Sequence, residues 1–136
     1  MTGDHFYKII LADDHALVRQ GIRKIIEEAG DLEVVGEAGD GMELLEILKT
    51  IQPDLVIVDI AMPRLRGLEA AKRIKLLYPQ IKVLILSMHR SKEYLHQAVA
   101  AGVSGYLLKE DADTALHTAI KAVRNGKEFF SPLLAI

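Results

Sequence analysis

The sequence predicts an α/β fold, an open doubly wound sheet of parallel strands with helices on both faces. Short apolar runs rich in Ile, Val and Leu alternate with longer segments in which apolar residues recur every three or four positions. The third and fourth runs are apolar at nearly every position, which is typical of parallel strands covered on both faces. Five such units are too few to close the usual eight-unit barrel.

The apolar runs define five expected strands. In chain order they are YKIILA (Tyr7 to Ala12), LEVVGEA (Leu32 to Ala38), LVIV (Leu55 to Val58), KVLIL (Lys82 to Leu86) and GYLL (Gly105 to Leu108).

The segments after these runs are expected to be helices. One apolar face contains Leu17, Ile22, Ile25 and Ile26, the next begins with Met42, Leu45 and Leu48, and three more helices are expected at about 67–78, 91–101 and 111–126. Ser91 and Asp111 are suitable helix N-caps. Glycines at 30, 102 and 126 stand where helices should end.

Composition indicates a soluble intracellular domain and excludes several classes of protein. The 136 residues suit one domain, and half of them are hydrophobic. The absence of cysteine excludes disulfides, thiolate zinc sites and cysteine nucleophiles. The net charge of −2 comes without a basic stripe, so a nucleic-acid-binding face is not expected within this chain. No apolar run is long enough for a membrane span, and the first residues lack a signal-peptide core.

Polar residues stand at the carboxyl ends of four predicted strands, the edge at which open α/β sheets bind ligands. The first strand ends in Asp13 and Asp14, the third in Asp59, the fourth in Ser87 and the fifth in Lys109. One such aspartate alone is more often only a helix N-cap. Five polar residues at matching strand ends favour a shared binding site.

Three carboxylates that converge at one edge repel one another unless a cation or a proton lies among them. An all-oxygen site with an open face suits Mg²⁺, which binds through a few carboxylates plus phosphate. Lys109 and Ser87 can contact phosphate oxygens. Asp59 is then the candidate nucleophile for phosphoryl transfer, and Asp13 and Asp14 are the candidate metal holders.

The sequence resembles the receiver domains of two-component response regulators, in particular the NarL/FixJ-type branch with LuxR-type output domains. The resemblance covers roughly residues 7–126. It is carried by IILADDHALVRQGIRKII, LVIVDIAMP followed by GLEAAKRI, ILSMH and AGVSGYLLKE. It implies a flavodoxin-like (βα)5 fold with strand order 2-1-3-4-5. It also implies a cytoplasmic phosphoacceptor that assists its own phosphorylation and dephosphorylation and is not a turnover enzyme.

The resemblance also implies roles for individual residues. Asp59 is the expected phosphoacceptor, Ser87 and Lys109 its partners, Tyr106 the switch residue, and the Mg²⁺ ligands are Asp13, Asp14, Asp59 and the backbone carbonyl of Ala61. The phosphodonor is a sensor histidine kinase or a small molecule, and a homodimer formed on phosphorylation stays an open alternative. Residues 1–127 are expected to form the receiver, and residues 128–136 to start a linker to a DNA-binding helix-turn-helix domain that this chain lacks.

Two departures from the family pattern lie next to the expected site. Arg64 and Arg66 stand where the family often has Gly and then Asp or Asn, and the two charges could alter metal affinity, donor choice or phosphoryl lifetime, or be merely solvated. Glu110 stands where many receivers have proline, so a trans peptide bond is expected after Lys109.

Other functions remain as alternatives. The chain could be a binding module that signals without phosphorylation, or a metal-dependent hydrolase of phosphate esters, although no acid for a leaving group is evident. The turn GEAGDG (36–41) does not match the dinucleotide pattern and is expected to be a loop. The five histidines are not clustered; His15 is expected to start the first helix.

Overall fold

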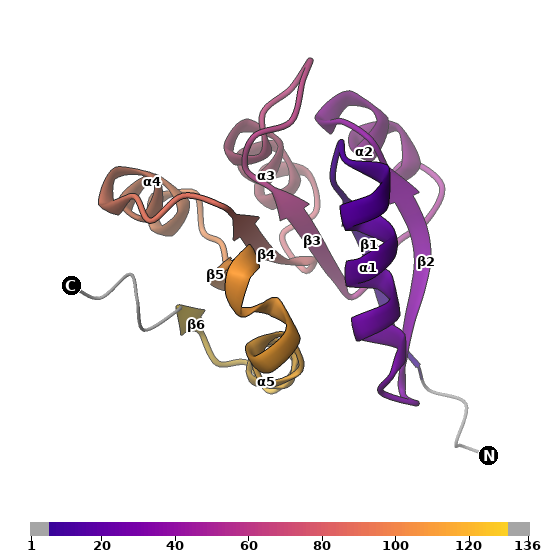
Figure 1. Ribbon diagram of the computed structural model, residues 1–136. Coiled ribbons are helices and arrows are strands. Elements are labelled where there is room, and N and C mark those ends of the chain that lie inside the picture. The colour runs from indigo at the N-terminus through magenta and orange to yellow at the C-terminus, as the bar shows by residue number, and fades with distance from the viewer. Residues whose placement is uncertain (1–5, 131–136) are drawn as a thin grey trace.

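The computed structural model describes residues 6–130 as a single sheet with helices on both faces (Figure 1). The elements follow one another in strict alternation up to the last helix. In chain order they are β1 (Tyr7–Ala12), α1 (Ala16–Glu27), β2 (Leu32–Ala38), α2 (Gly41–Ile47), β3 (Leu55–Asp59), α3 (Gly67–Leu77), β4 (Lys82–Ser87), α4 (Lys92–Ala100), β5 (Gly105–Leu108), α5 (Ala112–Arg124) and β6 (Phe129–Phe130).

The sheet is entirely parallel and has the order β2-β1-β3-β4-β5-β6. The predicted fold and the order of the first five strands are therefore confirmed. The sixth strand was not predicted: Phe129 and Phe130 lie in the segment expected to begin a linker, yet they pair with Gly105 and Tyr106. Residues 131–136 of that segment lie outside the described residues.

Two apolar layers hold the helices against the sheet. Because successive strand residues point to opposite faces, Ile9 and Leu11 pack toward α1 and α5, whereas Ile10 and Ala12 pack toward α2, α3 and α4. All five residues of β3 are buried, as expected for a central parallel strand. This rigid core fixes where the carboxyl ends of the strands, and the side chains that follow them, lie.

The helix boundaries follow the predicted capping residues in part. The Ser91 hydroxyl accepts a hydrogen bond from the backbone N–H of Tyr94 at 3.1 Å and caps α4. Gly102 and Gly126 have φ angles of 86° and 80°, the left-handed conformation that ends α4 and α5. A 3-10 turn (Lys109–Asp111) precedes α5, so Lys109 leaves β5 directly into a tight turn. None of the helices described here has the length and apolar character to cross a membrane.

Candidate functional site

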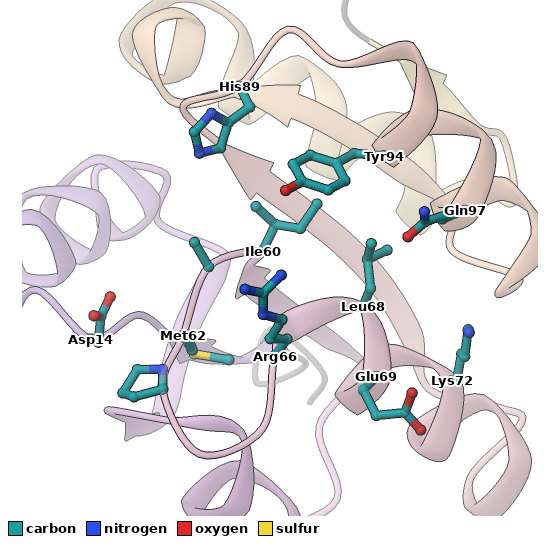
Figure 2. Close-up of a pocket in the computed structure, with 12 residues that line it drawn as sticks. Asp14, Ile60, Met62, Arg66, Leu68, Glu69, Lys72, His89, Tyr94 and Gln97 are labelled. Carbon is teal, nitrogen blue, oxygen red and sulfur yellow. The ribbon is translucent and has the colours of Figure 1, made fainter.

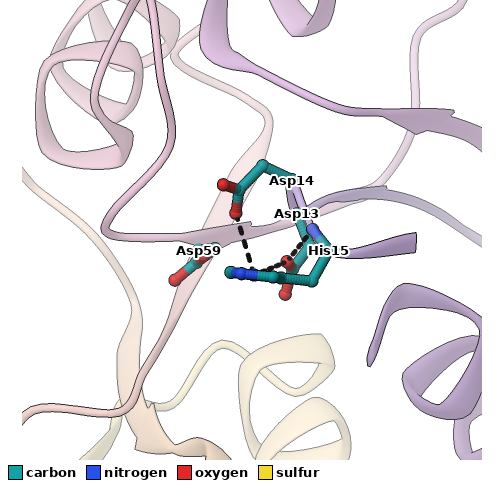
Figure 3. A group of neighbouring side chains, drawn as sticks. All are labelled: Asp13, Asp14, His15 and Asp59. Carbon is teal, nitrogen blue, oxygen red and sulfur yellow. Dashed lines mark hydrogen bonds and ion pairs between the residues drawn. The ribbon is translucent and has the colours of Figure 1, made fainter. Parts of the chain in front are cut away.

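The three predicted aspartates meet at the carboxyl edge of the sheet (Figure 3). Ala12 of β1 pairs with Val58 of β3, which places the residues that follow them, Asp13 and Asp59, side by side. One ligand atom from each of Asp13, Asp14, His15 and Asp59 lies within 4.8 Å of the others. The side chains of Asp13 and Asp59 are buried, whereas Asp14 is exposed, so the cluster is open to solvent on one side only.

Lys109 supplies the positive charge that this acidic cluster requires. Its Nζ lies 2.8 Å from Oδ2 of Asp13 and 3.3 Å from Oδ2 of Asp59, and its side chain is only 10% exposed. Although Lys109 Nζ is close enough for an ion pair, the buried Oδ2 of Asp13 accepts no hydrogen bond of favourable geometry. The lysine therefore screens two carboxylates at once and satisfies neither completely.

Burial dominates the protonation of Asp59. It raises the pKa of this carboxyl group above its ordinary value because the charged form is removed from water. The positive charge of Lys109 opposes the rise, and the negative charge of Asp13 adds to it. The backbone N–H of Ala61 lies 3.4 Å from Oδ1 of Asp59, at the long end of hydrogen bonding. Asp59 is thus a weakly solvated carboxylate that would gain from a further cation.

His15 joins the cluster, which the sequence did not predict. It is the residue before α1, as expected for a helix start, and its backbone N–H donates to Oδ1 of Asp13 at 2.9 Å. Its ring Nδ1 also lies 3.1 Å from Oδ1 of Asp14 and 3.6 Å from Oδ1 of Asp13. The adjacency of the histidine to the acidic pair in the sequence was the signal that could have indicated this contact.

The donor set fits a hard divalent cation. Three carboxylates from two neighbouring strand ends, one of them exposed, leave room for bound water on the open side. The incompletely satisfied Oδ2 of Asp13 and the weakly solvated Asp59 would both be stabilised by such an ion. The described residues therefore form an acidic site that can hold a cation beside a lysine.

The sequence matches a known family of protein domains. Residues 9–121 match the response regulator receiver domain family. The chain belongs to this family. It is 40% identical over 128 residues to the uncharacterized transcriptional regulatory protein YxjL of Bacillus subtilis, covering 94% of this chain and 59% of that protein. It is also 40% identical over 126 residues to the oxygen regulatory protein NreC of Staphylococcus carnosus, covering 92% of this chain and 58% of that protein.

Solved structures agree with the assignment. A LuxR-family two-component response regulator from Aurantimonas superimposes with a TM-score of 0.92 at 35% identity, covering 96% of this receiver domain and 93% of that chain. The isolated receiver domain of RcsB from Salmonella enterica, solved with the phosphomimetic BeF₃⁻, gives a TM-score of 0.89 at 31% identity and 96% coverage of both chains. The receiver domain described here spans about three fifths of the length of the curated relatives it matches.

The fourth strand of this receiver domain, β4, ends at Ser87, next to the strand that carries Asp59. Ser87 follows Leu86, the residue that pairs with Asp59, and it is fully buried. Its Oγ accepts a hydrogen bond of 2.9 Å from the backbone N–H of His89. The hydroxyl of Tyr106, whose side chain is also fully buried, donates to the carbonyl oxygen of His89 at 3.3 Å. Ser87 and Tyr106 therefore hold the same residue of the β4–α4 loop.

The β3–α3 loop of the receiver domain contains the two unusual arginines. Arg64 has a φ angle of 66°, the left-handed region that favours glycine, which agrees with the glycine that the family often has there. Its guanidinium donates to Oδ2 of Asp40 from Nε at 2.9 Å and from one terminal nitrogen at 2.7 Å. Asp40 is the N-cap of α2, so this ion pair ties the loop to α2 and directs Arg64 away from Asp59.

The turn between β5 and α5 contains Glu110 at the position where many receivers have proline. No cis peptide bond occurs in residues 6–130, which confirms the predicted trans bond between Lys109 and Glu110. Glu110 lies on the surface, where one of its carboxylate oxygens is 3.0 Å from a terminal nitrogen of Arg90 in the β4–α4 loop. The loops that follow β4 and β5 are thus linked above the strand ends that carry Ser87 and Lys109.

Proposed function

We propose that Asp59 is the phosphoacceptor of this receiver domain and that Mg²⁺ supports the transfer. The observation that carries this proposal is the convergence of three carboxylates and one largely buried lysine at the carboxyl edge of the sheet. Asp13, Asp14, Asp59 and the backbone carbonyl of Ala61 are the proposed metal ligands. A bound Mg²⁺ would neutralise negative charge on the donor phosphate and on the carboxylates during transfer.

The chain's own residues have distinct roles in the proposed reaction. A carboxylate oxygen of Asp59 attacks the phosphorus, and the bond between phosphorus and the leaving group breaks, with its electron pair going to the leaving group. Lys109 is already within ion-pair distance of Asp59, so it can pair with an oxygen of the transferred group without a long movement. Ser87 can donate its hydroxyl hydrogen to another phosphoryl oxygen, and we assign Tyr106 the role of switch residue.

The biological setting is part of the same proposal. The donor is a sensor histidine kinase or a small phosphorylated molecule, and the domain acts in the cytoplasm. The matched relatives are named as transcriptional regulators and are longer than this chain. Structures of RcsB include dimers bound to DNA. We therefore infer that this receiver, which includes β6, controls a transcription-regulating output through a linker that follows Phe130, and that phosphorylation promotes a homodimer.

The test is labelling of the intact protein by acetyl phosphate, followed by mass spectrometry. Wild-type protein should gain the mass of one phosphoryl group in MgCl₂ and none in EDTA. Asp59→Asn should gain none, because the amide is not a nucleophile for phosphorus. Asp54→Asn is the matched control, since Asp54 is an exposed aspartate at the opposite end of β3. Labelling of Asp59→Asn at the wild-type rate would disprove the assignment, and turnover of a phosphate monoester would favour a hydrolase.

A further inference from the structure

A pocket lies beside the acidic cluster, between the β3–α3 loop and α4 (Figure 2). Its volume is about 620 Å³, within the range that binds small molecules. The lining includes Asp14 and Ala61 on the side of the cluster, and Arg66, Lys72, His89 and Tyr94 around the rest. A molecule in this pocket would therefore be in contact with the proposed metal ligands at one end and with basic and aromatic side chains at the other.

The backbone next to Arg66 is pressed against Asp59. A Cβ atom at Gly67 would lie only 2.1 Å from the carbonyl oxygen of Asp59, so no residue with a side chain fits there without a shift. The N–H of Gly67 also donates to the carbonyl oxygen of Ile60 at 3.1 Å. Arg66 precedes this glycine, and its guanidinium is directed into the pocket toward Ile60 (Figure 2). The arginine is therefore held close to the acceptor residue by the shape of the loop.

The side chain of Arg66 makes no hydrogen bond or ion pair with any residue between 6 and 130, although its backbone carbonyl oxygen accepts from the N–H of Ala70 in α3. The acids of the pocket already have partners. Glu69 lies 3.8 Å from Nε of Arg73, and Asp14 lies 3.1 Å from Nδ1 of His15. An exposed guanidinium that faces a pocket and lacks a carboxylate partner can bind an incoming anion without first breaking an ion pair.

The contrast with Arg64 shows that the two loop arginines are not equivalent. Arg64 has the same charge and stands two residues away, but its guanidinium is bound to Asp40 outside the pocket. Only Arg66 lines the pocket that opens onto the acidic cluster. If positive charge near Asp59 affected phosphorylation in a general way, both arginines would contribute. If an arginine instead contacts a phosphodonor bound in the pocket, only Arg66 would contribute.

We propose that Arg66 positions small anionic phosphodonors, specifically acyl phosphates, for transfer to Asp59. An acyl phosphate is a dianion at neutral pH, so the carboxylates of the acidic cluster oppose its approach. A guanidinium can form two parallel hydrogen bonds to phosphate or carboxylate oxygens, which offsets this repulsion and orients the donor. This inference depends on the proposed acceptor role of Asp59 and names the class of donor for the same site.

The transfer itself balances without a further reactant. An oxygen of Asp59 forms a bond to phosphorus, and the bond between phosphorus and the acyl oxygen breaks. The electron pair of that bond leaves with the carboxylate, for example acetate, so no proton is needed. Arg66 acts before and during this step by holding the donor, which makes it a positioning residue and not the nucleophile.

The experiment compares Arg66→Gln with Arg64→Gln, which lose the same charge from the same loop. With acetyl phosphate in MgCl₂, Arg66→Gln should lower the second-order labelling rate constant about five- to tenfold, the effect of one partly exposed ionic contact. Arg64→Gln should lower it less than about twofold, because that side chain does not face the pocket. Arg66→Lys should recover part of the loss. Phosphoramidate has one negative charge fewer near neutral pH, so its rate should fall less in Arg66→Gln.

A binding measurement complements the rates. Acetylphosphonate cannot transfer its phosphorus, so its binding to Asp59→Asn protein, followed by amide NMR shifts, should weaken when Arg66→Gln is added and not when Arg64→Gln is added. Equal losses in both arginine variants, or equal losses with both donors, would overturn the proposal for Arg66. Absence of labelling of the wild-type protein by either donor would instead refute the acceptor role of Asp59.

Discussion

Asp59→Asn should make the metal-free receiver domain more stable. Burial raises the pKa of Asp59, so the folded protein binds this proton more tightly than the unfolded chain does. Above that pKa the ionised carboxylate opposes folding, and the opposition is greatest at neutral and alkaline pH. Asparagine has nearly the same shape and no charge, and its oxygen can still accept from the N–H of Ala61.

The size of the effect depends on the burial of Asp59 and on the charges around it. Ligand oxygens of Asp13 and Asp14 lie within 4.8 Å of an oxygen of Asp59. At an effective dielectric constant of about 20, each pair repels by about 3.5 kcal/mol, or about 7 kcal/mol together. Lys109, at 3.3 Å from Asp59, contributes about 5 kcal/mol of attraction at the same dielectric constant. Because Asp14 is exposed, its repulsion is screened and the neighbouring charges nearly cancel, so the cost of burying the ionised carboxylate decides the sign. We expect the substitution to stabilise the fold by about 1 kcal/mol.

Urea unfolding followed by circular dichroism at neutral pH measures this difference. In EDTA, Asp59→Asn should unfold at a higher urea concentration than wild type with an unchanged m-value. In MgCl₂ the wild type should gain more stability than the variant, because the substitution removes a proposed ligand. Asp54→Asn is the control: its exposed carboxylate accepts from the N–H of Lys8 at 2.9 Å, so its loss should not stabilise. A lower midpoint for Asp59→Asn in EDTA would refute the electrostatic reasoning.

Two further predictions concern the loop and the alkaline limit of stability. Gly67→Ala should destabilise by about 1–3 kcal/mol and slow labelling by acetyl phosphate, since its Cβ meets the Asp59 carbonyl oxygen at 2.1 Å. Gly21→Ala, in α1 with nothing within 4 Å of the new Cβ, should instead stabilise by about 1 kcal/mol, and urea unfolding compares the two. Burial, with a smaller contribution from Asp54, raises the pKa of Tyr7 to about 12. The folded state thus keeps this proton while the unfolded chain loses it near 10, so stability should fall with pH between about 10 and 12, and less in Tyr7→Phe.

The strands were predictable because a parallel sheet leaves a simple pattern in the sequence. A strand buried on both faces is apolar at nearly every position, and the runs Leu55–Val58 and Val83–Leu86 have this pattern. The apolar runs stop one residue before the strands do, at Val58 and Leu86, and the polar residues predicted at the strand ends complete the strands. Asp59 and Ser87 extend β3 and β4 because their backbones still pair with Leu86 and Leu108 of the neighbouring strands. A polar side chain ends an apolar run in the sequence, but the backbone pairing between strands continues through the polar residues Asp59 and Ser87.

The sixth strand was missed because its formation depends on a distant glycine. Two phenylalanines are too short a run to predict a strand on their own. The N–H of Phe129 donates to the carbonyl oxygen of Ser104 at 3.0 Å, and a Cβ at Gly105 would lie 2.6 Å from the carbonyl oxygen of Phe129. The glycine permits the close approach of a chain segment 24 residues later, which no local pattern predicts.

The sequence predicted which residues lie at the site, but it did not predict all of the contacts that charged residues make around it. Strand-end position was enough to bring Asp13, Asp59 and Lys109 together, because the topology leaves no other place for them. The ion pair between Arg64 and Asp40 was not predictable, since it joins loops 24 residues apart and requires a left-handed backbone at an arginine. Sequence patterns identify which loops carry charge, whereas pairing among those charges depends on loop conformation.

The contacts of His89 connect the proposed phosphorylation site to a loop on the protein surface. The backbone N–H of His89 donates to the hydroxyl oxygen of Ser87 at 2.9 Å. The backbone carbonyl oxygen of His89 accepts from the hydroxyl of Tyr106 at 3.3 Å. If Ser87 rotates toward a phosphoryl oxygen, the N–H of His89 loses its partner, and an unpaired backbone group favours a rearrangement of the loop. α4 begins three residues later, at Lys92, so the loop and the helix must respond together. We infer that a change of one or two hydrogen bonds, rather than a distortion of the sheet, selects between two arrangements of α4 and Tyr106.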